Sequence, residues 1–161
     1  MKAAVLTVSD GVAEGTREDR SGDLLDELLA GDGYEVERRV VPDDRDAIAD
    51  AIVSLADEGE AALVLTTGGT GLGPRDVTPE ATMSVLERAA PGIAEAIRAD
   101  SIAKTPHGLL SRGIAGVRGS TLVVNLPGSP GGCRDGFAVL QPALKHALEL
   151  LAGEPTAHKQ T

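Results

Sequence analysis

The stretch that decides the fold is Leu63–Thr78, which reads LVLTTGGTGLGPRDVT. Its apolar start predicts a buried strand. The glycines at 68–71 let the backbone adopt positive φ and let its N–H groups approach a ligand closely. Thr78 is then expected to cap a helix whose first turn holds Pro79 and Glu80. A strand, a glycine loop and a helix in this order are typical of anion sites in α/β proteins.

The glycine loop differs from the two commonest phosphate-binding motifs. No Gly-Lys-Ser/Thr follows it, as a Walker A sequence requires, and its glycines do not have the spacing of the dinucleotide fingerprint. The alternative is a plain turn without a ligand, but such connections usually take only about 2–6 residues. We therefore expect a phosphate site of another kind than these two motifs, built from backbone N–H groups and the hydroxyls of Thr67 and Thr70.

Length and composition limit the classes of protein to consider. A chain of 161 residues with 42% apolar and 25% charged residues suits one globular domain. A net charge of −10 argues against nucleic acid or an anionic membrane as partner. Cys133 is the single cysteine, so we expect a buried filler rather than a nucleophile or a disulfide. No signal-peptide pattern follows Met1, and no apolar run is long enough to span a membrane, so we expect a cytoplasmic protein.

The remaining segments alternate between apolar strands and amphipathic helices. We expect strands near 2–9, 34–41, 61–66, 114–118 and 120–126. We expect a helix capped by Ser21, a second that starts at Asp44, and a third over 79–89 with Met83 and Leu86 facing inward. After a break at 91–92 we expect a further helix to about residue 103, and a final helix to about residue 151. The pattern predicts a single three-layer α/β domain, with a mostly parallel central sheet flanked by helices. This domain is expected to occupy residues 1–153, followed by a loose C-terminal tail at 154–161.

Four polar segments follow predicted strands, at residues 9–11, 42–44, 67–76 and 125–132. Because parallel strands end at the same edge of a sheet, these segments should meet there. The last of them, NLPGSPGG, offers backbone donors ahead of a helix and is a candidate second phosphate site, with a plain turn as the alternative. Convergence of the four segments is stronger evidence for a ligand site than any single motif.

Asp43 and Asp76 form a candidate metal site from two different loops. Mg²⁺ is typically held by one or two carboxylates together with substrate phosphates. Capping of the following helix is the alternative for Asp43, since Asp is favoured at that position. Capping explains Asp76 less well, because Thr78 is the better cap.

A third candidate segment contains Ser111, Arg112, Ser101 and Lys104. Hydroxyls and cations in an irregular stretch can bind an anion, although a solvated loop explains them equally well. His107 lies there too, but the spacing of the histidines does not match a zinc site.

Several segments together resemble the molybdopterin adenylyltransferase family, the MogA and MoaB group whose fold gephyrin's G-domain shares. The matching segments are TVSD (7–10), DRSG (19–22), VVPDD (40–44), TTGGTG (66–71), RDVTPEAT (75–82), LSR (110–112) and GSTLVVNLPGSP (119–130). They cover nearly the whole chain in the family's order. The resemblance implies a molybdopterin-binding domain that forms a homotrimer, with trimers pairing into hexamers as an open alternative.

The resemblance also implies molybdenum cofactor biosynthesis by Mg²⁺-dependent transfer of AMP from ATP to molybdopterin, with release of pyrophosphate. It implies catalytic and metal-binding roles for Asp43 and Asp76. It further implies a set of substrate-binding residues: Gly68, Gly69, Thr70, Gly71, Ser101, Ser111, Asn125, Pro127 and Gly128. The expected protein partner is the molybdate-inserting enzyme of the same pathway.

Two rival functions follow from the same resemblance. One is a weakly catalytic or non-catalytic molybdopterin-binding or scaffolding module of the same fold; the intact Asp43 and Asp76 pair favours the enzyme. The other is a nucleotide-hydrolysing domain related to competence-damage proteins, which a short chain without a second domain disfavours.

Overall fold

The computed structural model describes residues 1–153; the predicted tail at 154–161 lies outside the described residues. Within that range the strands are β1 (Lys2–Val8), β2 (Glu35–Val41), β3 (Leu63–Thr67), β4 (Arg88–Ala89), β5 (Ala115–Arg118) and β6 (Thr121–Leu126). The α-helices are α1 (Asp10–Ala13), α2 (Arg20–Gly31), α3 (Arg45–Val53), α4 (Thr78–Val85), α5 (Pro91–Lys104) and α6 (Pro130–Leu151). A π-helical turn, η1 (Ser54–Glu58), extends α3, and a 3₁₀ turn, η2 (Pro106–Leu110), follows α5.

The sheet is mixed but mostly parallel, as predicted, with strand order β2-β1-β3-β6-β5-β4. β1 pairs in parallel with β2 and β3, and β3 pairs in parallel with β6. β5 runs antiparallel to both of its neighbours. β3 therefore lies between β1 and β6, and the glycine loop that follows it is flanked by the segments that follow those two strands.

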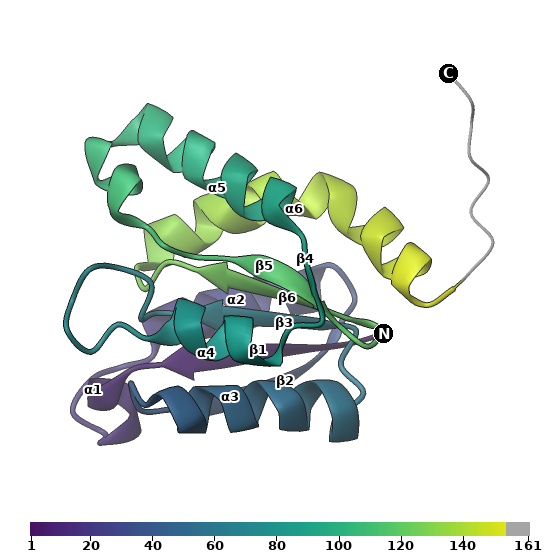
Figure 1. Cartoon of the computed structure of the whole chain (residues 1–161), viewed down its shortest axis with the longest axis horizontal. Helices are drawn as coiled ribbons and strands as arrows, with labels where there is room; N and C mark the ends of the chain where they lie inside the picture. Colours follow the sequence, from purple (N-terminus) through teal and green to yellow (C-terminus); the bar gives the residue numbers. More distant parts are fainter. Residues whose placement is uncertain (154–161) are drawn as a thin grey trace.

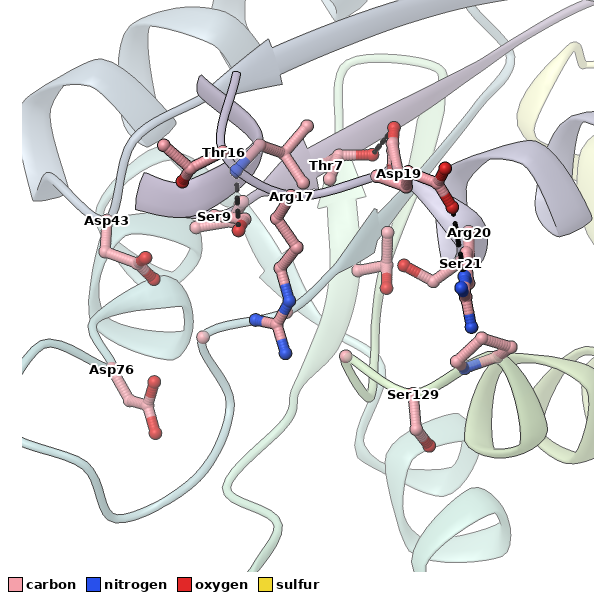
Figure 2. A pocket seen from close by; sticks show the side chains of 18 residues that line it. Thr7, Ser9, Thr16, Arg17, Asp19, Arg20, Ser21, Asp43, Asp76 and Ser129 are labelled. Atoms are coloured by element: carbon pink, nitrogen blue, oxygen red, sulfur yellow. Dashed lines mark hydrogen bonds and ion pairs between the residues drawn. The ribbon is translucent and has the colours of Figure 1, made fainter. Parts of the chain in front are cut away.

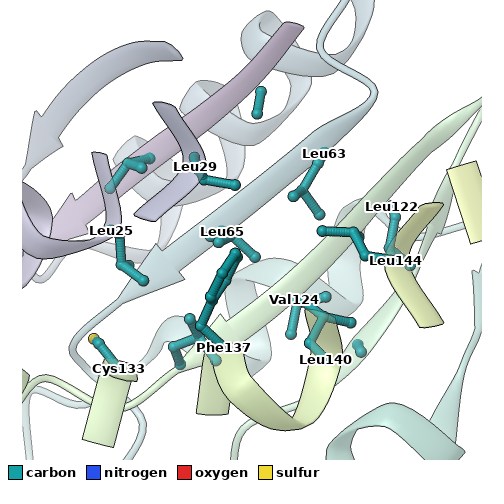
Figure 3. Close-up of a cluster of buried hydrophobic side chains, with 14 of the residues drawn as sticks. Leu25, Leu29, Leu63, Leu65, Leu122, Val124, Cys133, Phe137, Leu140 and Leu144 are labelled. Carbon is teal, nitrogen blue, oxygen red and sulfur yellow. The ribbon is translucent and has the colours of Figure 1, made fainter. Parts of the chain in front are cut away.

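Helices cover both faces of the sheet and give three layers (Figure 1). Side chains alternate along β3: Leu63 and Leu65 belong to the core shared with α2, α5 and α6, whereas Val64 belongs to the core shared with α3 and α4. Figure 3 shows Leu65 beside Phe137 of α6. Both cores are almost entirely aliphatic, as the composition predicts, and Phe137 is the one aromatic side chain buried in residues 1–153.

The helix starts agree only partly with the sequence prediction. The predicted start of α3 at Asp44 agrees to within one residue, since Asp44 is the cap and its carboxylate accepts from the backbone N–H of Ala47. The cap of α2 is Asp19 rather than Ser21, since the Asp19 carboxylate accepts from Gly22 N and the helix begins earlier. Thr78 does not cap α4 but is its first residue.

The predicted helix 79–89 is too long. α4 ends at Val85, after which the chain extends and pairs as β4 with β5. The backbone N–H groups of Glu87 and Ala90 donate to carbonyls of the β5 region, at 2.9 Å each, and strand pairing there replaces helical hydrogen bonds. Met83 is 56% exposed, so its predicted inward orientation is wrong, whereas Leu86 packs against the α3 side of the core.

No helix within residues 1–153 combines the length and apolar character needed to cross a membrane.

Candidate functional site

An open cavity of about 840 Å³ lies where β1, β2, β3 and β6 end. All four of the strand-following segments contribute to its lining, through Ser9, Asp43, Gly69 and Gly128 among others. The predicted convergence is therefore confirmed, and Figure 2 shows the side chains that surround the cavity.

The glycine loop at the floor of this cavity needs glycine at two positions. Gly68 has φ +99°, and a Cβ there would clash with the carbonyl oxygen of Val8. Gly69 has φ +69°, and a Cβ there would clash with the Thr78 hydroxyl. That hydroxyl donates to the carbonyl of Gly68 at 2.9 Å, and Thr78 N donates to the carbonyl of Gly69 at 3.1 Å. Thr78 thus holds the loop against the start of α4, which is why it does not serve as a cap.

Asp43 and Asp76 lie on one side of the cavity (Figure 2). Asp43 Oδ2 accepts from the backbone N–H of Asp10 at 2.9 Å, and Asp76 Oδ2 accepts from that of Gly73 at 3.0 Å. Among the described residues no hydrogen bond reaches the Oδ1 atom of either carboxylate. Because Asp44 caps α3, the capping alternative for Asp43 is wrong.

The electrostatics of this pair favour a bound cation. Burial raises the pKa of Asp43 above its ordinary value, and the negative charges of Asp10 and Asp76 raise it further. The backbone hydrogen bond from Asp10 and the charge of Arg75 oppose this rise. Two carboxylates that repel each other, each with an oxygen available, suit a divalent ion together with phosphate ligands.

Asp10 and Arg75 hold the loops that carry the acid pair. Asp43 N donates to Asp10 Oδ1 at 3.0 Å, which makes the Asp10–Asp43 hydrogen bonds reciprocal. Arg75 donates to both Asp10 oxygens, at 2.6 and 3.1 Å, and to the carbonyl of Asp43 at 3.1 Å. The Arg75 guanidinium lowers the pKa of Asp10. The loops after β1, β2 and β3 are joined by this cluster.

Arg112 holds the glycine loop from the opposite side. Its backbone N–H donates to the carbonyl of Thr70, and its guanidinium donates to the carbonyls of Gly71 and Asp76, all at 2.8 Å. It also forms an ion pair with Glu80 of α4. Arg112, predicted as an anion-binding candidate, therefore has its donors engaged with the protein. Thr70 and Gly71 contact it and lie outside the residues that line the cavity.

The two predicted serines also lie outside the cavity lining. The Ser111 carbonyl accepts from Arg98 Nη1 at 2.8 Å, and its hydroxyl accepts from Gly113 N at 3.4 Å. Ser101 is on α5, where its hydroxyl lies against Gly108 of η2.

The predicted polar segment 125–132, which begins in β6, contributes unequally to the cavity lining. Gly128 lines the cavity, close to Gly68. Pro127 lies just outside the lining, and its carbonyl accepts from the Thr67 hydroxyl at 2.7 Å. Asn125 is buried outside the cavity lining, and its side-chain amide donates to the hydroxyls of Thr66 and Thr82. Its Oδ1 accepts from Ile114 N, so Asn125 is a structural cross-link between elements.

Cys133 is buried beneath the same segment. Its sulfur lies 3.2 Å from the Thr67 hydroxyl and 3.1 Å from the Pro127 carbonyl. Burial raises the pKa of its thiol to about 11. The prediction of a filler residue is confirmed, because a protonated thiol is a poor nucleophile at neutral pH.

The sequence prediction missed one wall of the cavity. Residues 16–21, which end the link between α1 and α2 and begin α2, lie along it with Thr7 and Ser9 of the preceding segment. Asp19 in this wall is bonded to Thr7, Gly22 and Arg38, so its charge is neutralised within the protein. The signal was present, because TVSD and DRSG belong to the family pattern, but neither contains a run of glycines or an unexplained acid pair.

Comparison with known proteins agrees with this site. Residues 4–146 match the family model described as a probable molybdopterin binding domain. The chain is 38% identical over 152 residues to a molybdopterin adenylyltransferase of Helicobacter pylori, covering 92% of this chain and 86% of that protein. It is 38% identical over 160 residues to the Drosophila melanogaster molybdenum cofactor synthesis protein cinnamon, of which it spans only 26%.

A solved structure shows the same fold. The molybdopterin biosynthesis enzyme MoaB of Thermus thermophilus superposes with a TM-score of 0.89 at 47% identity, covering 96% of this chain and 98% of that one. Family match, sequence identity and fold agree over nearly all the described residues. The chain belongs to the molybdopterin-binding domain family of the molybdenum cofactor biosynthesis proteins.

Proposed function

We propose that this protein is a molybdopterin adenylyltransferase. The observation that carries the proposal is the acid pair Asp43 and Asp76 beside a floor of glycine backbone, in one cavity of a chain that resembles an adenylyltransferase over 92% of its length. The substrates are ATP and molybdopterin. An oxygen of the terminal phosphate of molybdopterin bonds to the α-phosphorus of ATP, the bond from that phosphorus to the β-phosphate oxygen breaks, and pyrophosphate leaves.

Mg²⁺ is the metal we assign to the acid pair. Within residues 1–153 no cluster of three or more His, Cys, Asp or Glu side chains is arranged to hold a metal. Asp43 and Asp76 alone fit Mg²⁺, which takes few protein ligands and completes its shell with water and substrate phosphates. Bound there, Mg²⁺ would neutralise phosphate charge in the transition state.

The other residues of the site bind and orient the substrates. The backbone N–H of Gly69 has no hydrogen-bond partner among the described residues and lies in the cavity lining, where a phosphate can approach it; the N–H of Gly68 is already bonded to the carbonyl of Leu126 at 3.3 Å. Asp10 and Arg75 fix the loops that carry the acid pair, and Arg112 fixes the outer part of the glycine loop. Such preorganisation lowers the barrier of a reaction between two anions, because the alignment is complete before chemistry begins.

The test is an incubation of the purified protein with Mg-ATP and molybdopterin. We expect pyrophosphate release together with adenylylated molybdopterin, and no product when EDTA removes the metal. Molybdopterin binding without any product would favour the non-catalytic scaffolding function instead. The wild-type protein without molybdopterin is the control for simple ATP hydrolysis.

The homotrimer, its pairing into hexamers, the cytoplasmic location and the molybdate-inserting partner are further parts of this proposal, supported by the family resemblance. Light scattering on the purified protein tests the oligomer, which we expect to have three times the mass of one chain. Co-purification with the molybdate-inserting enzyme tests the partner.

A further inference from the structure

We propose that Arg17 binds a phosphate group of the substrate at the centre of the cavity. This inference rests on the proposed function for the identity of the substrates. It concerns a residue in the linking segment 14–19, which neither the motifs nor the acid pair point to. Its basis is the distribution of charge and of hydrogen bonds around the cavity.

Two arginines line the cavity, Arg17 and Arg20. Arg20 forms an ion pair with Glu18 at 3.3 Å. The guanidinium of Arg17 has no hydrogen bond and no ion pair with any described residue. Its backbone is held, since Arg17 N donates to the carbonyl of Gly11 at 3.2 Å and the Arg17 Cβ lies against Gly11. Arg17 is thus a cation on an anchored backbone, with its donors available.

The Arg17 side chain extends into the cavity between two differently charged ends (Figure 2). On one side lie Asp43 and Asp76, and on the other lies Ser129, the N-cap of α6. The N-terminus of this 22-residue helix carries partial positive charge. Because the glycine floor has no side chains, the space that faces Arg17 is open to a ligand.

The charges of the lining residues show why such a cation is needed. Asp19 is neutralised by Arg38, and Glu18 by Arg20. Asp43 and Asp76 are left as two negative charges in a protein of net charge −10. A substrate with several phosphate charges is repelled by that field, and a metal ion at the acid pair neutralises only one end of the cavity. Arginine provides planar donors that match phosphate oxygens, and Arg17 supplies such donors at the centre of the cavity, away from the acid pair.

Two substrates carry phosphate, ATP and molybdopterin, and the experiment separates them. Calorimetric titration of wild type and Arg17→Gln would use ATP, inorganic pyrophosphate, adenosine and molybdopterin as separate probes. We expect Arg17→Gln to weaken the phosphate-containing ligand that Arg17 contacts by about tenfold, the effect of one charge-assisted hydrogen bond. Adenosine affinity should not change. If Arg17→Gln loses affinity for ATP and pyrophosphate, Arg17 binds a phosphate of the nucleotide. If the variant loses affinity for molybdopterin alone, Arg17 binds the phosphate of molybdopterin.

Arg134→Gln is the matched control. Arg134 is exposed on the second turn of α6 and lies outside the cavity lining, so its replacement removes the same charge without touching the cavity. We expect its affinities to stay within about twofold of wild type. Arg17→Lys should recover part of the loss, because the charge returns without the planar donors.

Equal affinity of wild type and Arg17→Gln for ATP, pyrophosphate and molybdopterin would overturn the inference. An equal loss of affinity in Arg134→Gln would also overturn it, because the effect would then come from the net charge of the protein and not from a contact. Failure of the proposed function gives a different result: wild type would form no adenylylated product, while the loss of phosphate affinity in Arg17→Gln would remain.

Discussion

Asp10 and Asp43 exchange hydrogen bonds, the backbone N–H of each donating to the carboxylate of the other, at 2.9 and 3.0 Å. The exchange fixes the Asp43 side chain with Oδ1 close to Gly69. It joins the ends of two neighbouring parallel strands, β1 and β2. The orientation of one proposed metal ligand therefore depends on a residue from another loop.

We expect Asp10→Ala to lower adenylyl transfer by about tenfold to a hundredfold, because the Asp43 loop and Arg75 lose their common partner. Steady-state kinetics should show the loss mainly in kcat, with a thermal midpoint close to that of wild type. Asp57→Ala is the control, because it breaks a comparable exposed pair with Arg118 on another part of the surface. An Asp10→Ala variant with wild-type kcat would contradict this positioning role.

Asp76→Asn should abolish adenylyl transfer while leaving the fold intact. The amide oxygen can still accept from Gly73 N, so the loop keeps its hydrogen bond and only the negative charge is lost. Product formation at saturating Mg-ATP is the measurement, with circular dichroism as the check on folding. Wild-type turnover in this variant would exclude a metal-binding or catalytic role for Asp76.

Gly69→Val should block binding of ATP and molybdopterin. The residue has φ +69°, and its Cβ would displace the Thr78 side chain and with it the bond to Gly68. Gly33→Val is the matched control, because Gly33 has φ +88° but no atom within 4 Å of the added Cβ. Both variants should lose stability, but only Gly69→Val should lose affinity in calorimetry; unchanged affinity there would refute the assignment of the loop.

Asn125→Ala should reduce stability rather than ligand contact. Its amide bonds the hydroxyls of Thr66 and Thr82, and no atom of Asn125 lines the cavity. Loss of buried hydrogen bonds costs roughly 1–3 kcal/mol, which chemical denaturation measures as a lower free energy of unfolding. If stability were unchanged and molybdopterin affinity fell sharply, Asn125 would have to be counted as a ligand-binding residue.

The Cys133 thiol should resist alkylation in the native protein at pH 8 and react in denaturant. Its pKa of about 11 in the folded protein lies above the ordinary value of 9.0, so the folded state holds the proton more tightly. The free energy of unfolding should therefore fall as the pH rises from about 9 to 11, where only the unfolded thiol ionises. Rapid labelling of the native protein by iodoacetamide at pH 8 would contradict the burial.

Local sequence patterns predicted the sheet and the floor of the cavity well. Apolar runs such as 63–65 mark buried strands, and a parallel arrangement brings the segments after them to one edge, so Asp43 and Gly69 could be grouped from the sequence. The end of α4 could not be predicted, because β4 forms only through its pairing with β5. The roles of Arg75 and Arg112 were also hidden, since their partners are carbonyls and acids from other loops. Arg17 was missed because an exposed arginine in a polar segment looks like ordinary surface until the cavity is known.

The direction of the strands and of α6 has an architectural consequence. β1 runs from Lys2 toward the cavity, and α6 starts at the cavity and runs away from it to Leu151. Both ends of the described chain therefore emerge remote from the ligand site (Figure 1). Cinnamon, of which this chain spans 26%, is a much longer protein. In this fold, a further domain fused at either end would leave the entrance for ligands open, so the unit can be joined to others without redesign of its site.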